Sequence, residues 1–280
     1  MPELPEVETI KNDLIPYVVG KTITNVTFPP DPKIRILRRF PSQNKFITEL
    51  QGTKIKSLQR RAKYLIFDIQ PSRTLIMHLG MSGQLLIRKA GVPPEPYLQA
   101  IFHLENATEI RFVDPRKFGE LFLKLPSSKD FPLNLSRLGP EPLGESFSLI
   151  YFTTVIQKSR RKIKTLLMDQ KAVAGIGNIY SDEILFRAKI HPERIAFGLK
   201  EREIELLHRT IRKTLREAIF NRGTTASDGR YLNGTGRRGK FQTKLKVYQR
   251  QGEPCYRCGA IIRRVRIGGR SASFCPQCQK

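Results

Sequence analysis

Apolar side chains near the start of the chain recur with the period of an α-helix. They fall three or four residues apart, on Val7, Ile10, Leu14 and Val18. Pro5 suits the first turn of a helix, where a missing backbone N–H has no partner to lose, and Gly20 lies just beyond the last apolar position. The pattern predicts a helix over residues 5–18.

Between residue 22 and about residue 125 the pattern is that of β-strands. Residues 64–69 alternate with period two and are apolar on both faces except at Asp68. Residues 102–104 and 110–112 flank the polar segment 105–108, an arrangement typical of a β-hairpin. Several strands at short intervals without intervening helices favour a sandwich or a barrel.

The second half of the chain begins after a change in composition. Residues 126–142 are rich in Pro, Ser and Gly, which is typical of a linker between domains. A helical stripe then follows on Ile204, Leu207, Ile211, Leu215 and Ala218. Gly223 lies where a helix cap is expected. With 280 residues, the chain is long enough for two hydrophobic cores.

A glycine-rich segment follows this helix. Residues 224–240 have little apolar content and contain Gly229, Gly234, Gly236 and Gly239. The segment therefore predicts a loop, which is either a lid over a site or a plain connector.

All four cysteines of the chain lie near its end, as C-x2-C-x16-C-x2-C. They are Cys255, Cys258, Cys275 and Cys278. Two thiol pairs joined by a short arc are typical of a tetrahedral zinc site, and four thiolates leave no position for substrate, so one structural zinc ion is expected. The alternative is two disulfides in an oxidising compartment. Because no signal peptide precedes Pro2, zinc in a reducing cytoplasm is favoured.

Positive charge is concentrated in the half that holds the cysteines. Residues 1–150 carry 21 basic and 15 acidic side chains, a net charge of +6, whereas residues 151–280 carry 29 and 10, a net charge of +19. This concentration favours a phosphate-binding surface and hence a nucleic acid partner. The chain has no apolar run of eighteen residues and no basic amphipathic helix with an aromatic face, so a membrane partner is not expected.

The residues after Met1 suggest covalent chemistry. A small penultimate residue such as Pro2 permits removal of the initiator methionine, which would expose a secondary amine able to form an iminium ion with an electrophilic carbon. Glu3 could then act as a general acid beside it. The alternative is that Glu3 and Glu6 only complement the dipole of the predicted helix.

Motifs along the whole chain resemble those of the bacterial formamidopyrimidine-DNA glycosylases, in the order of that family. They are Pro2-Glu3-Leu4-Pro5-Glu6-Val7-Glu8-Thr9, Arg60-Arg61-Ala62-Lys63-Tyr64-Leu65, His78-Leu79-Gly80-Met81-Ser82-Gly83, Asp114-Pro115-Arg116-Lys117-Phe118-Gly119, Leu138-Gly139-Pro140-Glu141-Pro142-Leu143, Gly175-Ile176-Gly177-Asn178-Ile179-Tyr180 and Cys275-Pro276-Gln277-Cys278-Gln279. The resemblance covers essentially the whole chain.

The resemblance implies an α+β multidomain fold. An N-terminal β-sandwich domain with an N-terminal helix is expected over residues 1–130, and a linker over 131–150. A helix-two-turns-helix DNA-binding domain with a lesion-capping loop is expected over 151–240. A zinc finger with a β-hairpin is expected over 241–280.

The resemblance also implies an enzyme of base excision repair. Such an enzyme extrudes an oxidised purine (8-oxoguanine or a formamidopyrimidine) from duplex DNA, cleaves the glycosidic bond through a Schiff base, and nicks the strand by β- and δ-elimination. By matching motif, Pro2 would be the nucleophile and Glu3 the acid that assists opening of the sugar. Lys63 would donate a proton and bind phosphate, and Arg270 would clamp the lesion phosphates and assist δ-elimination.

Further residues match DNA-binding positions of the family. Met81, Arg116 and Phe118 would fill the void left by the extruded base, with Arg116 bonded to the orphaned partner base. Phosphate contacts are expected from Arg160, Lys164 and Asn178. Where relatives often carry a Lys-His-x-His-like element, this chain reads Pro96-Tyr97-Leu98-Gln99, so Tyr97 would bond phosphate through its hydroxyl.

These expectations describe a monomer that acts on damaged double-stranded DNA in the bacterial cytoplasm, at the nucleoid. Two other functions stay open at this point. One is the sister class of glycosylases that act on oxidised pyrimidines, and the other is a zinc-containing DNA-binding protein without catalytic activity.

Overall fold

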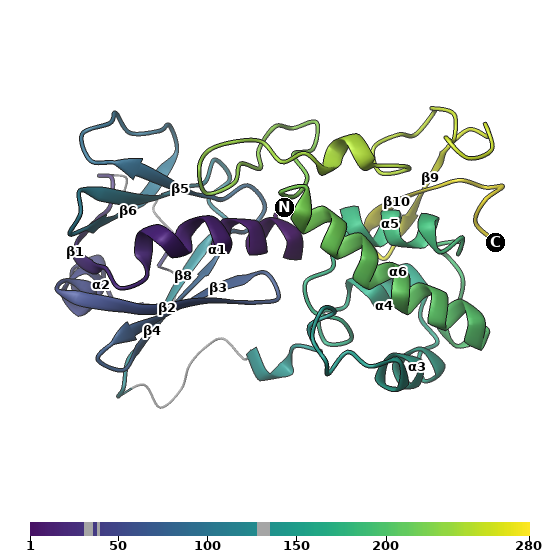
Figure 1. The fold of residues 1–280 in the computed structure, drawn as a ribbon, viewed down its shortest axis with the longest axis horizontal. Helices are drawn as coiled ribbons and strands as arrows, with labels where there is room; N and C mark the ends of the chain where they lie inside the picture. The colour runs from purple at the N-terminus through teal and green to yellow at the C-terminus, as the bar shows by residue number, and fades with distance from the viewer. Residues whose placement is uncertain (31–35, 38–39, 128–134) are drawn as a thin grey trace. The chain divides into compact units, whose positions relative to one another are not determined.

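The computed structural model describes residues 1–30, 36–37, 40–127 and 135–280 (Figure 1). The chain forms two compact units. The N-terminal unit comprises Met1–Leu135 and Asn221–Gln242, and the C-terminal unit comprises Ser136–Phe220 and Thr243–Lys280. The glycine-rich loop thus belongs to the N-terminal unit, although it follows a helix of the C-terminal unit in sequence. The bounds of the four segments expected from the resemblance stay predictions.

The N-terminal unit contains one eight-stranded antiparallel sheet, in the order β5-β7-β6-β1-β2-β3-β4-β8. Its strands are β1 (Thr22–Thr27), β2 (Thr53–Arg61), β3 (Tyr64–Gln70), β4 (Arg73–His78), β5 (Gln84–Lys89), β6 (Leu98–Leu104), β7 (Thr108–Val113) and β8 (Glu120–Lys124). The expected hairpin is β6–β7, in which Phe102 pairs with Ile110.

Helix α1 (Leu4–Val18) confirms the helix expected near the N-terminus. It contacts β2 and β3 near one end of the strand order and β5 at the other, so the sheet folds round the helix into two layers (Figure 1). The apolar face of α1 is fully buried and belongs to the same core as side chains of both layers. The expected N-terminal β-sandwich with a helix is confirmed.

A second helix, α2 (Gln43–Leu50), interrupts the region expected to be entirely β. Ser42 caps it by accepting the backbone N–H of Lys45, and Phe46 and Leu50, four residues apart, are buried. Eight residues offer only two buried positions, which is too short a repeat to distinguish from a strand by pattern alone.

The C-terminal unit is helical apart from one hairpin. It contains α3 (Leu149–Gln157), α4 (Ile163–Met168), α5 (Asn178–Arg187), α6 (Glu201–Phe220), β9 (Arg263–Ile267) and β10 (Arg270–Phe274), with a short 3-10 turn at η2 (Ala196–Gly198). Two further 3-10 turns, η1 (Leu135–Arg137) and η3 (Phe241–Lys244), lie where the chain passes from the N-terminal to the C-terminal unit. The predicted stripe of α6 is confirmed, because all five of its apolar positions are buried against α3 and α5. The helical domain and C-terminal hairpin expected from the sequence are confirmed.

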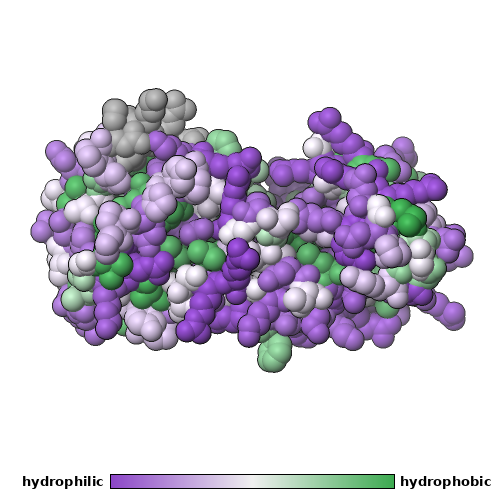
Figure 2. Space-filling model, turned by 90° about the horizontal axis from the view of Figure 1, so that it is seen from above, coloured by the Kyte–Doolittle hydropathy of each residue, from purple (hydrophilic) through white to green (hydrophobic). Residues whose placement is uncertain are grey.

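Part of the predicted linker, residues 128–134, lies outside the described residues. No helix in the described parts of the chain combines the length and apolar character needed to cross a bilayer. On the face drawn in Figure 2, hydrophilic residues predominate and apolar residues occur in small separate groups.

Candidate active site and metal centre

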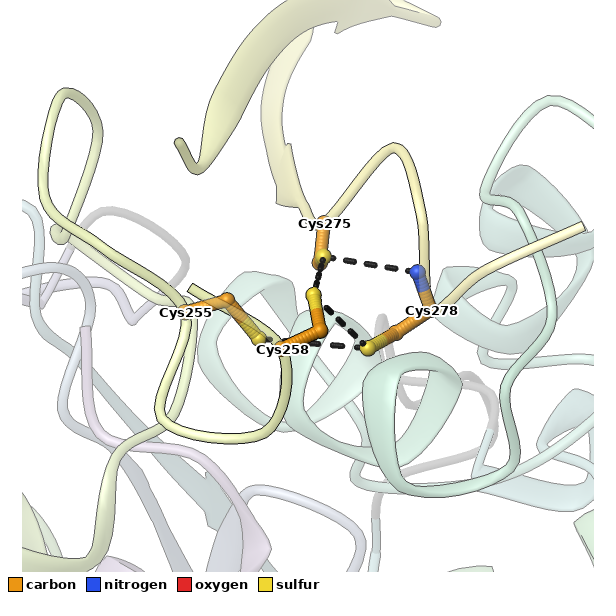
Figure 3. A group of neighbouring side chains, drawn as sticks. All are labelled: Cys255, Cys258, Cys275 and Cys278. Atoms are coloured by element: carbon orange, nitrogen blue, oxygen red, sulfur yellow. Dashed lines mark hydrogen bonds between the residues drawn. The ribbon is translucent and has the colours of Figure 1, made fainter. Parts of the chain in front are cut away.

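The four cysteine sulfurs of the C-terminal unit meet in one cluster, with every ligand atom within 4.8 Å of the others (Figure 3). Sγ–Sγ distances are 3.4 Å for Cys258–Cys278, 3.5 Å for Cys258–Cys275 and 3.9 Å for Cys255–Cys278. A tetrahedron with Zn–S bonds of ~2.3 Å has edges of about 3.8 Å, so the set fits zinc. Disulfides are excluded because the four thiols are free.

Groups around the cluster hold the ligands in place. Gln279 is buried and its Oε1 accepts the N–H of Cys275 at 2.9 Å, while its Nε2 donates to the Ile190 carbonyl at 2.9 Å. The N–H of Arg257 points at Cys255 Sγ at 3.4 Å. Such contacts orient thiolates and stabilise their charge. The site is therefore built as a closed structural centre, and the expected structural zinc is confirmed.

The zinc-linked hairpin presents arginines to solvent. Strands β9 and β10 pair antiparallel, and Gly268 and Gly269, at φ +53° and +77°, make the two-residue turn between Ile267 and Arg270. Arg263, Arg264, Arg266 and Arg270 are exposed. A surface hollow of about 570 Å³ lies against this hairpin and is lined in part by Arg264 and Arg266. This basic surface suits an anionic polymer.

The burial of Lys164 contradicts the expectation that its side chain binds phosphate. Its side chain is fully buried, and its Nζ lies 2.5 Å from Asp182 Oδ1 and 2.5 Å from the Ser271 carbonyl. Asp182 Oδ2 in turn accepts the N–H of Ser273 at 3.0 Å, and burial raises the pKa of Asp182 to about 7. A lysine in this position fixes β10 to helices α4 and α5 and has no surface from which to contact a phosphate.

The other two predicted phosphate ligands of this unit are placed differently. Arg160 is exposed in the turn between α3 and α4. Asn178 is the first residue of α5, and its buried Oδ1 has no hydrogen-bond partner among the described residues. Gln170, which was not among the site residues expected from the sequence, stabilises the turn that precedes Asn178. Its Oε1 accepts the N–H of Gly175 at 2.7 Å, and its Nε2 donates to the Ile176 carbonyl at 2.8 Å. The N–H groups at the start of α5 add to an electropositive end.

In the N-terminal unit, Pro2 and Glu3 are buried at the start of α1. The N–H of Glu3 donates to Glu6 Oε2 at 2.9 Å, and Glu6 Oε1 accepts the N–H of Thr224 at 2.7 Å. One buried carboxylate therefore holds both the N-terminal segment and the start of the glycine-rich loop.

The glycine-rich loop is packed on the N-terminal unit along its length. Asp13 binds Arg222 at 2.5 Å and accepts the N–H of Gly234 at 3.1 Å. On the edge strand β5, Ile87 donates its N–H to the Gly234 carbonyl at 2.8 Å, and Gln84 Nε2 donates to the Arg230 carbonyl at 2.6 Å. These contacts exceed what a plain connector needs, and they place the loop beside the helix that begins after Pro2.

Lys63 lies in the tight turn that joins β2 to β3, where Arg61 pairs with Tyr64. Lys63 is buried. The burial of His78, together with the positive charge of Lys63, lowers the pKa of His78 to about 4. His78 is therefore neutral near pH 7; its Nδ1 accepts the N–H of Gly80 at 3.3 Å, and its ring packs on Tyr64 at 4.8 Å. His78 begins one of the family motifs but was not among the site residues expected from the sequence.

The three predicted void-filling residues meet at one end of the sheet. Met81 and Phe118 are 38% and 50% exposed, which is high for large apolar side chains. Arg116 Nη1 lies 3.6 Å from Met81 Sδ. The grouping fits apolar wedges beside a base-reading guanidinium.

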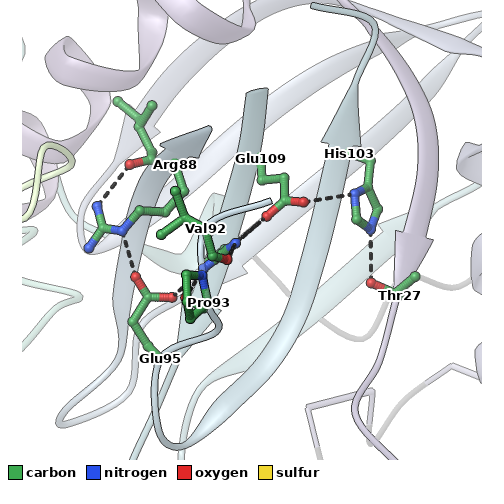
Figure 4. Close-up of polar contacts among 9 residues, drawn as sticks. Thr27, Arg88, Val92, Pro93, Glu95, His103 and Glu109 are labelled. Carbon is green, nitrogen blue, oxygen red and sulfur yellow. Dashed lines mark hydrogen bonds and ion pairs between the residues drawn. The ribbon is translucent and has the colours of Figure 1, made fainter. Parts of the chain in front are cut away.

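Tyr97 is also exposed and ends a loop that is fixed to the sheet. Arg111 is almost fully buried and bonds the carbonyls of Val92 and Pro93 at 2.6 and 2.8 Å, and the carboxylate of Glu95 at 3.1 Å. Figure 4 shows the surrounding polar network, in which Glu95 also accepts a hydrogen bond from Arg88 Nε, and the Glu109 carboxylate contacts the ring of His103. The loop that leads to Tyr97 is thus held by buried charge.

Three family models match successive parts of the chain. The formamidopyrimidine-DNA glycosylase N-terminal domain matches residues 1–121, the formamidopyrimidine-DNA glycosylase H2TH domain matches 138–229, and the zinc finger found in FPG and IleRS matches 252–280. The chain belongs to the formamidopyrimidine-DNA glycosylase family.

Relatives of this family agree over the full length. The formamidopyrimidine-DNA glycosylase of Cytobacillus firmus is 42% identical over 279 residues, covering 100% of both chains. That of Bacillus subtilis is 41% identical over 282 residues, covering 100% of this chain and 99% of the relative.

Solved structures of family members share the fold. Lactococcus lactis Fpg in complex with DNA containing an abasic site superposes with a TM-score of 0.89 at 37% identity, covering 99% of each chain. MutM (Fpg) from Thermus thermophilus gives 0.86 at 41% identity, covering 99% of this chain and 98% of that one. The wild-type Lactococcus lactis protein with DNA containing an oxidised pyrimidine gives 0.86 at 36% identity, covering 100% of both.

Proposed function

We propose that this member of the formamidopyrimidine-DNA glycosylase family is a bifunctional DNA glycosylase and AP lyase of base excision repair. It excises 8-oxoguanine and formamidopyrimidines from duplex DNA and nicks the strand by β- and δ-elimination. The observation that supports this most strongly is that the family match spans all three domains and includes the Pro2–Glu3 start.

The nucleophile in this proposal is the Pro2 nitrogen, once Met1 is removed. Its lone pair attacks the sugar carbon of the lesion, the glycosidic bond breaks, and the base leaves with its electron pair and a proton. Glu3 protonates the sugar oxygen as the ring opens, which leaves an iminium ion on Pro2. Glu3 is buried directly after Pro2, at the start of α1, and this position supports the role.

Strand scission follows from the same intermediate. Loss of a proton next to the iminium carbon expels the 3′ phosphate, and a second elimination expels the 5′ phosphate. Lys63 donates a proton and binds phosphate in the first elimination, and Arg270 binds the lesion phosphates and assists the second. Lys63 lies beside neutral His78, and Arg270 is exposed at the tip of the zinc hairpin.

The DNA partner is held by phosphate contacts and read at the lesion. Arg160, Asn178 and Tyr97 bind phosphate, while Met81, Arg116 and Phe118 enter the void left by the extruded base. The protein acts as a monomer at the nucleoid in the bacterial cytoplasm, where its substrate lies.

Oxidised pyrimidines are a second substrate class. The support is the complex of the Lactococcus lactis relative with DNA containing such a lesion. A panel of duplexes that differ only in the lesion would rank the two classes.

The direct test is incubation with a duplex that carries one 8-oxoguanine, with the undamaged duplex of the same sequence as control. We expect release of the base and a nicked strand with phosphate at both ends, from the lesion duplex alone. Binding without excision or nicking would instead support a non-catalytic DNA-binding protein.

A further inference from the structure

Asp114 has a fully buried carboxylate, and both of its oxygens accept hydrogen bonds. Oδ1 accepts the Ser82 hydroxyl at 2.6 Å and the N–H of Arg116 at 3.2 Å. Oδ2 accepts the N–H of Gly119 at 2.7 Å. The carboxylate thus ties the loop after β4, which contains Ser82, to the loop after β7, which contains Arg116.

The two loops are in direct backbone contact at Gly80. A Cβ on Gly80 would lie 2.5 Å from the carbonyl carbon of Phe118, and Gly80 has a φ of +59°. Only glycine fits such an approach, so the loops interlock as closely as the backbone allows. Met81 follows Gly80 directly, which fixes its position relative to Phe118.

Tyr97 is joined to the same point. The backbone N–H of Asp114 donates to the Tyr97 carbonyl at 3.0 Å, and Gln99 Nε2 donates to the same carbonyl at 3.0 Å. Tyr97 has a φ of +64°, a conformation that a bulky side chain rarely adopts, and it is 61% exposed. A strained backbone that is held from two sides under an exposed aromatic ring points to a function for that ring.

We propose that Asp114 is a positioning residue that holds Met81, Arg116, Phe118 and Tyr97 as one preformed DNA-contacting group. The inference rests on the proposed function. All four side chains are exposed. The three loops that carry them, which follow β4, follow β7 and end at Tyr97, are all hydrogen-bonded to the buried Asp114. Extrusion of a base requires the wedge to enter the stack as the base leaves, so loops that had to order at that moment would slow the step.

The test is Asp114→Asn, which keeps the shape of the side chain. An amide has one acceptor oxygen and one donor nitrogen. In the variant, either the N–H of Gly119, or the Ser82 hydroxyl and the N–H of Arg116, therefore faces a donor instead of an acceptor. We expect single-turnover excision of 8-oxoguanine from duplex DNA to slow by about 10- to 100-fold, in step with slower base extrusion reported by 2-aminopurine fluorescence. Affinity for undamaged duplex should not change, since phosphate contacts carry it.

A second substrate separates positioning from general damage to the enzyme. A single-stranded oligonucleotide with a preformed abasic site has no partner base and no stacked duplex to open, so its nicking should keep the wild-type rate in Asp114→Asn. Equal losses on both substrates would overturn the inference.

Matched variants complete the design. Asp68→Asn changes a half-exposed aspartate on β3 that lies 3.9 Å from Lys56, and it should behave as wild type on both substrates. If Asp114→Asn does not fold, Ser82→Ala removes one of the hydrogen bonds to the carboxylate and should slow duplex excision in the same direction, by a smaller factor. Wild-type extrusion in the folded variants would overturn the inference, whereas a wild-type protein that neither excises nor nicks would overturn the proposed function.

Discussion

Glu6 Oε1 accepts the backbone N–H of Thr224 at 2.7 Å, although 218 positions separate the two residues in sequence. Because the other oxygen of this buried carboxylate binds the N–H of Glu3, the start of α1 and the start of the glycine-rich loop share one anchor. A Cβ on Gly223 would lie 2.9 Å from the same oxygen, so the contact also depends on a glycine beside Thr224.

Glu6→Gln should therefore destabilise the N-terminal unit. The amide replaces one acceptor oxygen with a donor that faces a backbone N–H, and a buried polar group without its partner costs about 1–3 kcal/mol. Urea unfolding would measure this loss, and hydrogen exchange at Thr224 should accelerate. The control is Glu49→Gln, which breaks a partly exposed ion pair with Arg73 and should cost less than about 1 kcal/mol. Equal losses in the two variants would contradict the anchoring role of Glu6.

His78 should make stability depend on pH on the acid side of neutrality. Its pKa is about 4 in the folded protein, against an ordinary value of 6.5, because of burial and the charge of Lys63. Between these values the unfolded chain binds a proton that the folded protein does not, so stability falls as pH drops from about 6.5 to about 4 and is fully present above that window. Across the whole window the loss of stability is about 3 kcal/mol.

The variant that checks this is His78→Asn, which keeps an acceptor near the position of Nδ1 for the N–H of Gly80. Urea unfolding at about pH 7 and about pH 4.5 should show a smaller loss of stability for the variant than for the wild-type protein. Carboxylates titrate equally in both proteins, so the difference reports His78 alone. An identical pH dependence in the two proteins would contradict the shifted pKa.

Much of the fold could be predicted where the signal lies within one element. The stripe of α1, the β6–β7 hairpin, the stripe of α6 and the cysteine spacing each depend on neighbours in sequence, and each is confirmed. The family motifs extended this to the order of the domains. Helix α2 was missed because two buried positions define no period.

Contacts between distant residues could not be predicted in this way. Lys164 ends a basic run that is typical of a solvated surface, yet its partners are Asp182 and Ser271, which lie 18 and 107 positions away. The buried ammonium group is tolerated there because the Asp182 carboxylate and the Ser271 carbonyl accept its hydrogen bonds. The roles of Asp114 and Glu6 are hidden for the same reason, since a carboxylate in a motif does not reveal which backbone groups it will accept.

Removal of zinc should loosen the C-terminal hairpin and leave the N-terminal unit folded. A two-stranded hairpin is marginal without support, and the cluster ties both of its flanks together. We expect Cys258→Ser, or a chelator, to abolish zinc binding, to raise hydrogen exchange in β9 and β10, and to weaken DNA binding measured by fluorescence anisotropy. Added zinc should restore the chelated wild-type protein but not the variant. A zinc-free protein with intact DNA affinity would show that the metal does not support the binding surface.

The proposed nucleophile makes the N-terminus intolerant of even one added residue. Placing a glycine before Pro2 turns its amine into an amide, whose delocalised lone pair cannot form an iminium ion. The extended protein should fold and bind duplex DNA as wild type does, because its basic surface is unchanged, but it should neither nick lesion DNA nor be trapped on it by borohydride. Glu3→Gln is the companion variant and should keep binding while base excision stalls. Wild-type activity in a protein shown by intact mass to retain Met1 would overturn this chemistry, and a trapped adduct that maps to Lys63 would assign the nucleophile there.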